Sequence, residues 1–137
     1  MSLRASMITK IATTSSRIRT LVVNHSPASI AAISTILERD QRIDVVATAQ
    51  DGIIGLRTAM AQAPDLIVMD ADAACLTGLE PAESLKERVP GAKIMIVFGD
   101  DDRHLARIAK VFGADALLLS SRLSAECESQ LVRLFPA

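Results

Sequence analysis

The residues best placed to do chemistry stand where short apolar runs of the sequence end. They are Asn24, His25, Asp70, Phe98 and Ser120. If the runs are parallel strands, their carboxyl ends share one edge of a sheet, which is where open α/β sheets bind ligands. Asp70 directly follows an interior run and is the carboxylate at that edge, with Asp72 two residues further on. We favour a functional role for Asp70 over the alternative, in which its carboxylate only caps local backbone.

The apolar runs alternate with segments of helical periodicity. The predicted strands are Arg19–Asn24, Ile43–Ala49, Leu66–Met69, Lys93–Phe98 and Ala116–Leu119. The predicted helices are Ala28–Asp40, Ile53–Gln62 with Asp51 as N-cap, Pro81–Arg88, the segment from Asp100 to Gly113, and Ser124–Leu134 with Ser124 as N-cap. Short apolar strands alternating with helices are typical of a parallel sheet covered on both faces, and right-handed crossovers favour a doubly wound arrangement.

Two further local expectations follow from the same pattern. In the second helix, Ile53, Leu56, Ala59 and Met60 are expected to share one apolar face, because their spacing matches the helical repeat. The stretch Ala71–Gly78 has no clear period and is expected to be irregular.

Length and composition limit the class of protein. A chain of 137 residues fits one domain with its own core, which we place at residues 17–137. Half of the residues are hydrophobic but Trp and Tyr are absent, so the core must be aliphatic. The net charge of −1 supplies no field for nucleic acid or an anionic membrane, and we expect neither contact. Residues 1–16, with Ser, Thr, Arg4 and Lys10 but no acid, are predicted to be a disordered leader or a cloning remnant.

Other titratable residues receive structural interpretations. Cys75 and Cys127 match no disulfide framework or metal-ligand spacing, and free thiols fit a reducing, cytoplasmic compartment. The immediate neighbours of Cys75 carry no charge, which favours an inert thiol over a reactive one. Asp100–Asp102 are expected to face water at a helix start, and His104 is expected to face solvent rather than bind a ligand.

Several short motifs become specific through their order and spacing. They are Leu21-Val22-Val23 before Ser26-Pro27, Ala47–Gly52, Pro64–Asp70 before Gly78-Leu79-Glu80, and Gly113-Ala114-Asp115 before the last strand. From about Arg19 to Leu134 the chain resembles the receiver domain of bacterial two-component response regulators. The resemblance implies a flavodoxin-like sheet of five parallel strands in the order 2-1-3-4-5. It also makes Asp70 the position that accepts a phosphoryl group from a histidine kinase.

The same resemblance identifies positions at which this chain departs from the family. Asn24 and His25 stand where the family places two acidic residues that help to hold Mg²⁺. Phe98 replaces the Ser or Thr that binds the phosphoryl oxygen, and Ser120 replaces the lysine after the last strand. The aromatic switch residue of the fifth strand is Leu117 here.

These departures weaken the chemistry expected at Asp70. Mg²⁺ prefers several hard oxygen ligands, so we expect no cofactor beyond Mg²⁺ held weakly by Asp70 and Asp72. Phosphoryl transfer relies on positioning and charge stabilisation, so phosphorylation is expected to be weak or absent. Phe98 either fills the volume of the phosphoryl group or completes the core. His25 either lies beside Asp70 and, when protonated, replaces the missing positive charge, or is a loop residue bonded to backbone.

Three classes of function are compatible with these observations. The leading hypothesis is a signalling module that is not an enzyme and acts through protein–protein contacts, with a homodimer through the fourth helix, Ala116–Leu119 and Ser124–Leu134 as one output. The alternative is a conventional receiver, phosphorylated on Asp70 by a histidine kinase and controlling transcription through a separate DNA-binding domain. A small α/β enzyme or flavin carrier is disfavoured, because no phosphate-binding loop follows the first strand and no Trp or Tyr could flank a flavin.

Overall fold

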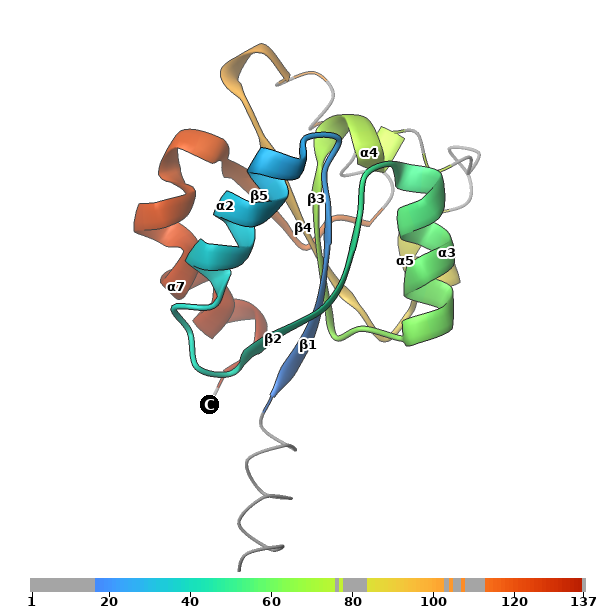
Figure 1. Cartoon of the computed structure of the whole chain (residues 1–137), viewed down its shortest axis with the longest axis horizontal. Coiled ribbons are helices and arrows are strands. Elements are labelled where there is room, and N and C mark those ends of the chain that lie inside the picture. Colours follow the sequence, from blue (N-terminus) through green and yellow to red (C-terminus); the bar gives the residue numbers. More distant parts are fainter. Residues whose placement is uncertain are drawn as a thin grey trace, which may run out of the picture.

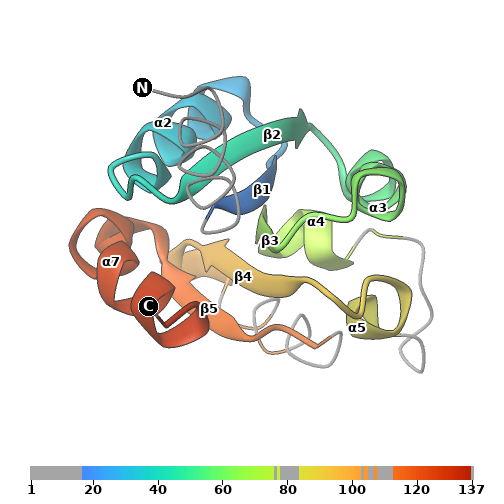
Figure 2. The same cartoon turned by 90° about the horizontal axis from the view of Figure 1, so that it is seen from below.

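Five parallel strands form the centre of the molecule in the computed structural model, which describes residues 17–75, 77, 84–102, 104, 107 and 113–136. The strands are β1 (Ile18–Val23), β2 (Ile43–Ala49), β3 (Leu66–Asp70), β4 (Lys93–Phe98) and β5 (Ala116–Leu119). Their order across the sheet is β2-β1-β3-β4-β5, as Figure 2 shows. The predicted flavodoxin-like, doubly wound sheet is confirmed, with each predicted strand boundary within one residue of the observed one.

Helices cover both faces of the sheet (Figure 1). They are α2 (Pro27–Leu37), α3 (Gly52–Gln62), α4 (Ala71–Cys75), α5 (Leu85–Arg88) and α7 (Leu123–Leu134), with 3₁₀ turns η1 (Asp100–Asp102) and η2 (Ser120–Arg122). The helices α2 and α7 lie side by side on one face, and α3, α4 and α5 lie on the other. None of the described helices is long and apolar enough to cross a membrane.

Each face of the sheet has its own aliphatic core. The cluster under α2 and α7 includes Val22, Val68, Met95, Val97 and Leu118, and the cluster under α3, α4 and α5 includes Leu21, Val23, Ile67, Met69 and Ile96. Side chains that alternate along each strand supply both clusters, because successive residues of a strand point to opposite faces. The continuous apolar runs of the sequence are explained by this burial on two sides.

Side-chain caps fix the start of two helices. The Ser26 hydroxyl accepts a hydrogen bond from the Ser29 N–H at 3.2 Å, and Pro27 occupies the first helical position of α2. The Asp51 carboxylate accepts from the Ile54 N–H at 2.7 Å, which confirms it as the N-cap of α3. The predicted end of α2 at Asp40 is wrong by three residues, since the helix ends at Leu37.

The predicted irregular segment after β3 is wrong, because Ala71–Cys75 forms the short helix α4 directly after the strand. The helix predicted over Pro81–Arg88 is observed from Leu85, with Ser84 as its N-cap, and residues 81–83 lie outside the described ones. Most of the predicted fourth helix also lies outside them, and His104 there is helical and exposed as expected.

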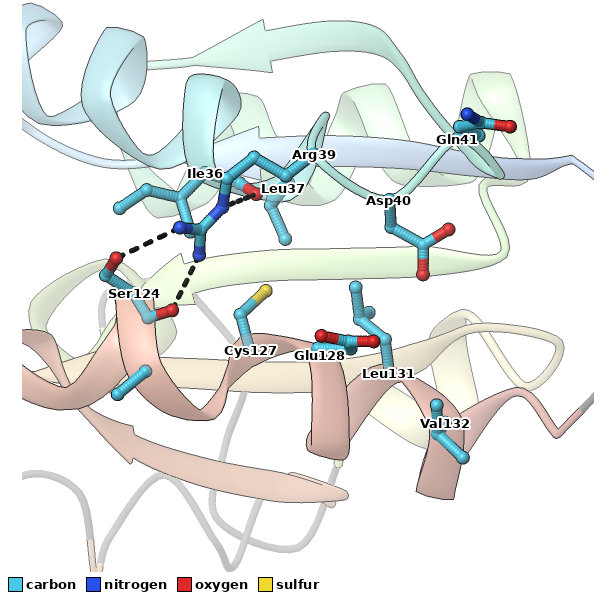
Figure 3. A pocket seen from close by; sticks show the side chains of 11 residues that line it. Ile36, Leu37, Arg39, Asp40, Gln41, Ser124, Cys127, Glu128, Leu131 and Val132 are labelled. Atoms are coloured by element: carbon cyan, nitrogen blue, oxygen red, sulfur yellow. Dashed lines mark hydrogen bonds between the residues drawn. The ribbon is translucent and has the colours of Figure 1, made fainter.

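The last helix begins one residue earlier than predicted. The 3₁₀ turn η2 leads directly into α7 at Leu123, so Arg122 and not Ser124 is the N-cap. Ser124 has a tertiary role instead: its hydroxyl and carbonyl oxygens accept hydrogen bonds from the Arg39 guanidinium at 3.1 and 2.6 Å (Figure 3). This contact ties the end of α2 to the start of α7.

The face that α3 turns to the sheet agrees in part with the predicted one, since Leu56 and Ala59 pack against the core as expected. Gly55 and Ala59 are buried, whereas Ile53 and Met60 are exposed. A Cβ atom on Gly55 would lie 2.8 Å from Cγ2 and 2.9 Å from Cγ1 of Val23, so β1 and α3 approach too closely for a larger residue. The close approach requires a small residue at position 55, while Leu56 packs against the core beside it and Ile53 and Met60 remain exposed.

Polar contacts at the amino ends of the strands join the elements. The Asp65 carboxylate accepts a hydrogen bond from the Arg19 N–H at 2.9 Å, and the Arg19 guanidinium donates to the Gln62 and Ala63 carbonyls at 2.7 and 3.0 Å. These contacts anchor the end of α3 to the start of β1. They satisfy helix C-terminal carbonyls that have no partner within the helix.

A second polar contact at the same edge involves α5 and β5. The Asp115 carboxylate accepts from the Ile94 N–H at 2.8 Å and forms an ion pair with Lys86 at 2.9 Å. Gly113 has a φ of 93°, and a Cβ atom there would lie 2.2 Å from Cγ of Lys86. The Gly113-Ala114-Asp115 motif is therefore needed for the chain to pass Lys86 and enter β5.

Candidate functional site

Asp70 is the last residue of β3, the central strand of the sheet. Its backbone is in register with Val97 of β4, and β1 lies on the other side of β3. The Asp70 side chain is 11% exposed, so one end of a largely buried carboxylate reaches the surface. This is the position that the sequence predicted for the central acid of the site.

Both oxygens of the Asp70 carboxylate have hydrogen-bond partners. Oδ1 accepts from the Ala73 N–H at 2.7 Å, and Oδ2 lies 2.6 Å from Nδ1 of His25 and 3.4 Å from its backbone N–H. The first contact is an N-cap interaction with α4, so the alternative role of local backbone capping is present in the structure. Sequence reasoning missed Ala73, although the Asp70–Cys75 sequence of an acid before small residues favours a short capped helix.

His25 is the side chain that brings potential positive charge to Asp70. Its ring is 72% exposed, while Nδ1 faces the carboxylate. The hypothesis that His25 lies beside Asp70 is confirmed as a contact, and the charge of the ring stays a prediction. A protonated imidazole at this distance would make a charge-assisted hydrogen bond. Solvent around the ring weakens the attraction relative to a buried pair.

Asn24 is buried beside this contact but is directed to local backbone. Its N–H donates to the Ala49 carbonyl at 3.0 Å, and its Oδ1 accepts from the Ser26 N–H at 2.9 Å. The second bond forms an Asx turn that leads the chain from β1 into α2. The side-chain oxygen of Asn24 thus helps to shape the loop.

The aromatic ring of Phe98 lies at the end of β4. It is partly buried and packs against the core cluster under α3, α4 and α5, as Leu117 does. This packing supports the interpretation in which Phe98 completes the core. Occupation of a phosphoryl-binding volume by the same ring stays a prediction.

Ser120 follows β5 and is exposed in η2. Its carbonyl accepts the Leu123 N–H, which joins η2 to α7. Ser120 therefore contributes to the turn through its backbone, at the position where the family resemblance places a lysine.

Asp72 lies on α4 and is exposed. Within the described parts of the chain, no group of three or more His, Cys, Asp or Glu side chains is arranged to hold a metal ion. Burial and the charge of Asp72 both raise the pKa of the Cys75 thiol, with burial the larger cause. Burial likewise raises the pKa of Cys127, so both thiols are less reactive than an exposed cysteine.

A separate groove lies between α2 and α7. It has a volume of about 530 Å³ and runs past Leu37, Cys127 and Leu131, with Asp40 and Glu128 on opposite walls (Figure 3). The Asp40 carboxylate is already held by Arg42 at 3.1 Å. The groove belongs to the α2–α7 packing and is formed by residues other than those around Asp70.

The family model of the response regulator receiver domain matches residues 20–121. The chain belongs to this family. The match covers β1 from Thr20 onward and all of β2 to β5, and it places the Asp70–His25 contact within a receiver domain of two-component signal transduction.

Curated relatives differ in what surrounds the shared segment. The receiver domain is 35% identical over 80 residues to a protein-glutamate methylesterase/protein-glutamine glutaminase of Geobacter metallireducens, covering 58% of this chain and 22% of that protein. It is 27% identical over 103 residues to a nitrate/nitrite response regulator protein homolog of Haemophilus influenzae, covering 75% of this chain and 50% of that protein. The chain thus spans between about a fifth and a half of the length of these relatives.

Solved structures share the fold. The response regulator domain of CheB from Thermotoga maritima superposes with a TM-score of 0.72 at 21% identity, over 88% of this chain and 98% of that one. The signal receiver domain of NarL from Mycobacterium tuberculosis superposes with a TM-score of 0.70 at 20% identity, over 88% of this chain and 98% of that one. At these identities the likeness supports the fold alone.

Proposed function

We propose that this receiver domain signals through protein–protein contacts, with weak or no Mg²⁺-dependent phosphorylation of Asp70. The observation that carries the proposal is the state of the Asp70 carboxylate, which caps α4 through Oδ1 and contacts His25 through Oδ2. Each oxygen keeps lone-pair capacity that could attack phosphorus, but the attack would draw negative charge from the carboxylate and so weaken the hydrogen bonds that it accepts.

The residues around Asp70 supply little compensation for that weakening. Asn24 binds the Ser26 N–H, Phe98 is apolar and Ser120 is neutral, so the permanent cation and the hydroxyl expected of the family are absent from these positions. Loss of a single well-placed stabilising donor slows reactions that build up charge by about 10²–10³-fold. Two or three such losses together would reduce transfer to a level of little use in signalling.

The proposal includes what the domain does not do. We expect no enzymatic turnover by this domain. We also expect no nucleic-acid contact by it, since its net charge is −1. Its partners would be a histidine kinase or another signalling protein in the cytoplasm, or a second copy through the predicted homodimer face. Most of the fourth helix of that face lies outside the described residues.

A direct test is incubation of the purified protein with a small phosphodonor and Mg²⁺, followed by intact-mass measurement. We expect no phosphoryl adduct on the wild-type chain. A matched gain-of-function variant combines Asn24→Asp, His25→Asp, Phe98→Thr and Ser120→Lys, and we expect it to acquire an Mg²⁺-dependent adduct that Asp70→Asn removes.

The second candidate is a conventional receiver phosphorylated on Asp70, with control of transcription through a separate output domain. Asp70 at the end of β3 favours it, because the carboxylate retains the family position and a solvent-exposed end. A wild-type adduct that requires Mg²⁺ and disappears in Asp70→Asn would establish this candidate and overturn the first.

A further inference from the structure

The outward face of α3 carries an unusual share of exposed apolar surface. Ile53, Ile54 and Met60 are 48%, 51% and 54% exposed. Among the described residues the other exposed large hydrophobic side chain is Val132 on α7. Three of these four therefore gather on one helix of eleven residues. Clustered exposed apolar side chains mark interaction sites more often than single ones do.

These three side chains lie outside both core clusters of the domain. The inward face of α3 is formed by Gly55, Ala59 and the partly buried Leu56. Val23 of β1 leaves no room for a larger residue at Gly55. About half of each of the three outward side chains is exposed to water. A contact outside this domain would give them a role.

Arg57 lies in the middle of this apolar face. It is four residues from Ile53 and three residues from both Ile54 and Met60, so all of them are neighbours on the helix surface. Arg57 is exposed, and within the described part of the chain it has no hydrogen bond or ion pair. The face thus presents one unpaired cation surrounded by apolar groups.

A groove extends the apolar face toward α5. Met60 lines a hollow of about 360 Å³ together with Ala63 and Pro64 at the end of α3 and Val89 and Pro90 after α5, and the charged residues Asp65 and Arg88 lie on its lining as well. Both helices lie on the same face of the sheet (Figure 1). A partner that covers the outward face of α3 could therefore also insert an apolar side chain between α3 and the turn before β4.

We infer that the outward face of α3 and this groove dock an amphipathic helix of a protein partner that presents an acidic side chain among apolar ones. An apolar face with a central unpaired arginine is complementary to such a helix in polarity and charge. The inference goes beyond the proposed function because it names a surface and a partner chemistry, and it does not depend on the chemistry of Asp70.

Charge also discriminates against other occupants. Arg57 is the central residue of α3, so two copies packed through α3 about a two-fold axis would bring their Arg57 side chains together. An anionic lipid surface is usually held by several basic residues, whereas this face and groove supply Arg57 and Arg88 together with the acidic Asp65. The exposed apolar area is small compared with a standard interface, so the contact is expected to be weak and transient.

The test uses two synthetic helical peptides with the same leucine stripe and a central Glu or a central Lys. Each is titrated into the ¹⁵N-labelled wild-type chain, and backbone amide shifts are followed by NMR. We expect the Glu peptide to perturb the amides of α3 and of the Val89–Ala92 turn and to bind about two- to fivefold more tightly than the Lys peptide. The preference should reverse in Arg57→Glu and weaken with salt.

Variants at exposed positions separate docking from folding. Ile53→Ser and Met60→Ser should each weaken binding of the Glu peptide with unchanged thermal unfolding, whereas the matched control Val132→Ser on α7 should leave binding intact. Equal binding of both peptides, or shifts confined to α7, would overturn the inference. So would concentration-dependent α3 shifts without peptide, which indicate self-association, or stronger binding to phosphatidylglycerol vesicles than to the Glu peptide.

Discussion

The two edges of the sheet differ in how their carboxylates are held. At the amino ends of the strands, Asp115 pairs with Lys86 and Asp40 pairs with Arg42, so permanent cations neutralise the acids. At the carboxyl ends, Asp70 contacts His25, whose charge depends on pH. The chain therefore uses fixed charge pairs to join elements at the amino-end edge and leaves the Asp70 carboxylate at the other edge with a titratable partner.

The largest expected effect concerns Asp115 at the amino-end edge. Asp115→Ala removes the acceptor of the buried Ile94 N–H and leaves Lys86 without its ion-pair partner. We expect a loss of about 2–3 kcal/mol in the free energy of unfolding, measured by urea denaturation. Asp115→Asn keeps an acceptor for the N–H and should lose less, which separates the hydrogen bond from the charge.

At the carboxyl-end edge, substitution of Asp70 should have a smaller effect. Asp70→Ala removes the N-cap of α4 and should cost about 1 kcal/mol. Asp70→Asn keeps an oxygen for the Ala73 N–H and loses the contact with an exposed imidazole. We therefore expect the free energy of unfolding to fall by less than about 0.5 kcal/mol. The same urea series measures both. If Asp70→Ala lowered the free energy of unfolding as much as Asp115→Ala does, the two edges of the sheet would not differ in how strongly their carboxylates stabilise the fold.

Acid should weaken the amino-end edge through Asp40. The hydrogen bond from Arg42 lowers the pKa of Asp40 below its ordinary value of 3.8, although partial burial opposes the shift. A lowered pKa in the folded state stabilises the protein above the unfolded value, and this stabilisation is lost as the pH falls below about 3.8. Asp40→Asn should cost less than about 1 kcal/mol at pH 6 and should flatten the pH dependence of stability below pH 4. An unchanged slope would show that the pair does not contribute.

The smallest expected effect is a change in the titration midpoint of His25. The Asp70 carboxylate favours the protonated ring, so the pKa of His25 should be lower in Asp70→Asn than in the wild-type chain. NMR of the imidazole resonances against pH measures the midpoint in both proteins. Equal His25 midpoints in the two proteins would mean that the contact carries no charge coupling.

Sequence patterns located the elements well because their causes are local. Short aliphatic runs rich in β-branched residues and bounded by turn signals favour strands buried on two sides, and the strands were found within one residue. Asp51 was recognised as an N-cap because its geometry depends on residues only three positions away. Ser124 was assigned wrongly by the same rule, since a tertiary contact with Arg39, 85 residues earlier, uses its hydroxyl instead.

The candidate site was predicted in part. Its residues came from the strand ends and from the family resemblance, and the contact of His25 with Asp70 was one of two alternatives. The N-cap bond from Asp70 to Ala73 was missed because the segment after β3 was expected to be irregular. Asp70 can accept this bond only because the backbone after β3 turns into a helix. The residue types alone did not predict that backbone conformation.

The sequence by itself determined the layer architecture and the position of the central acid, because hydrophobic periodicity and strand ends are properties of short segments. The tertiary structure decided which side of α3 faces the core, because only the approach of Val23 to Gly55 shows that position 55 must be small and point inward. It also decided that both oxygens of Asp70 are engaged, since those bonds join residues that fold into proximity from β1, β3 and α4.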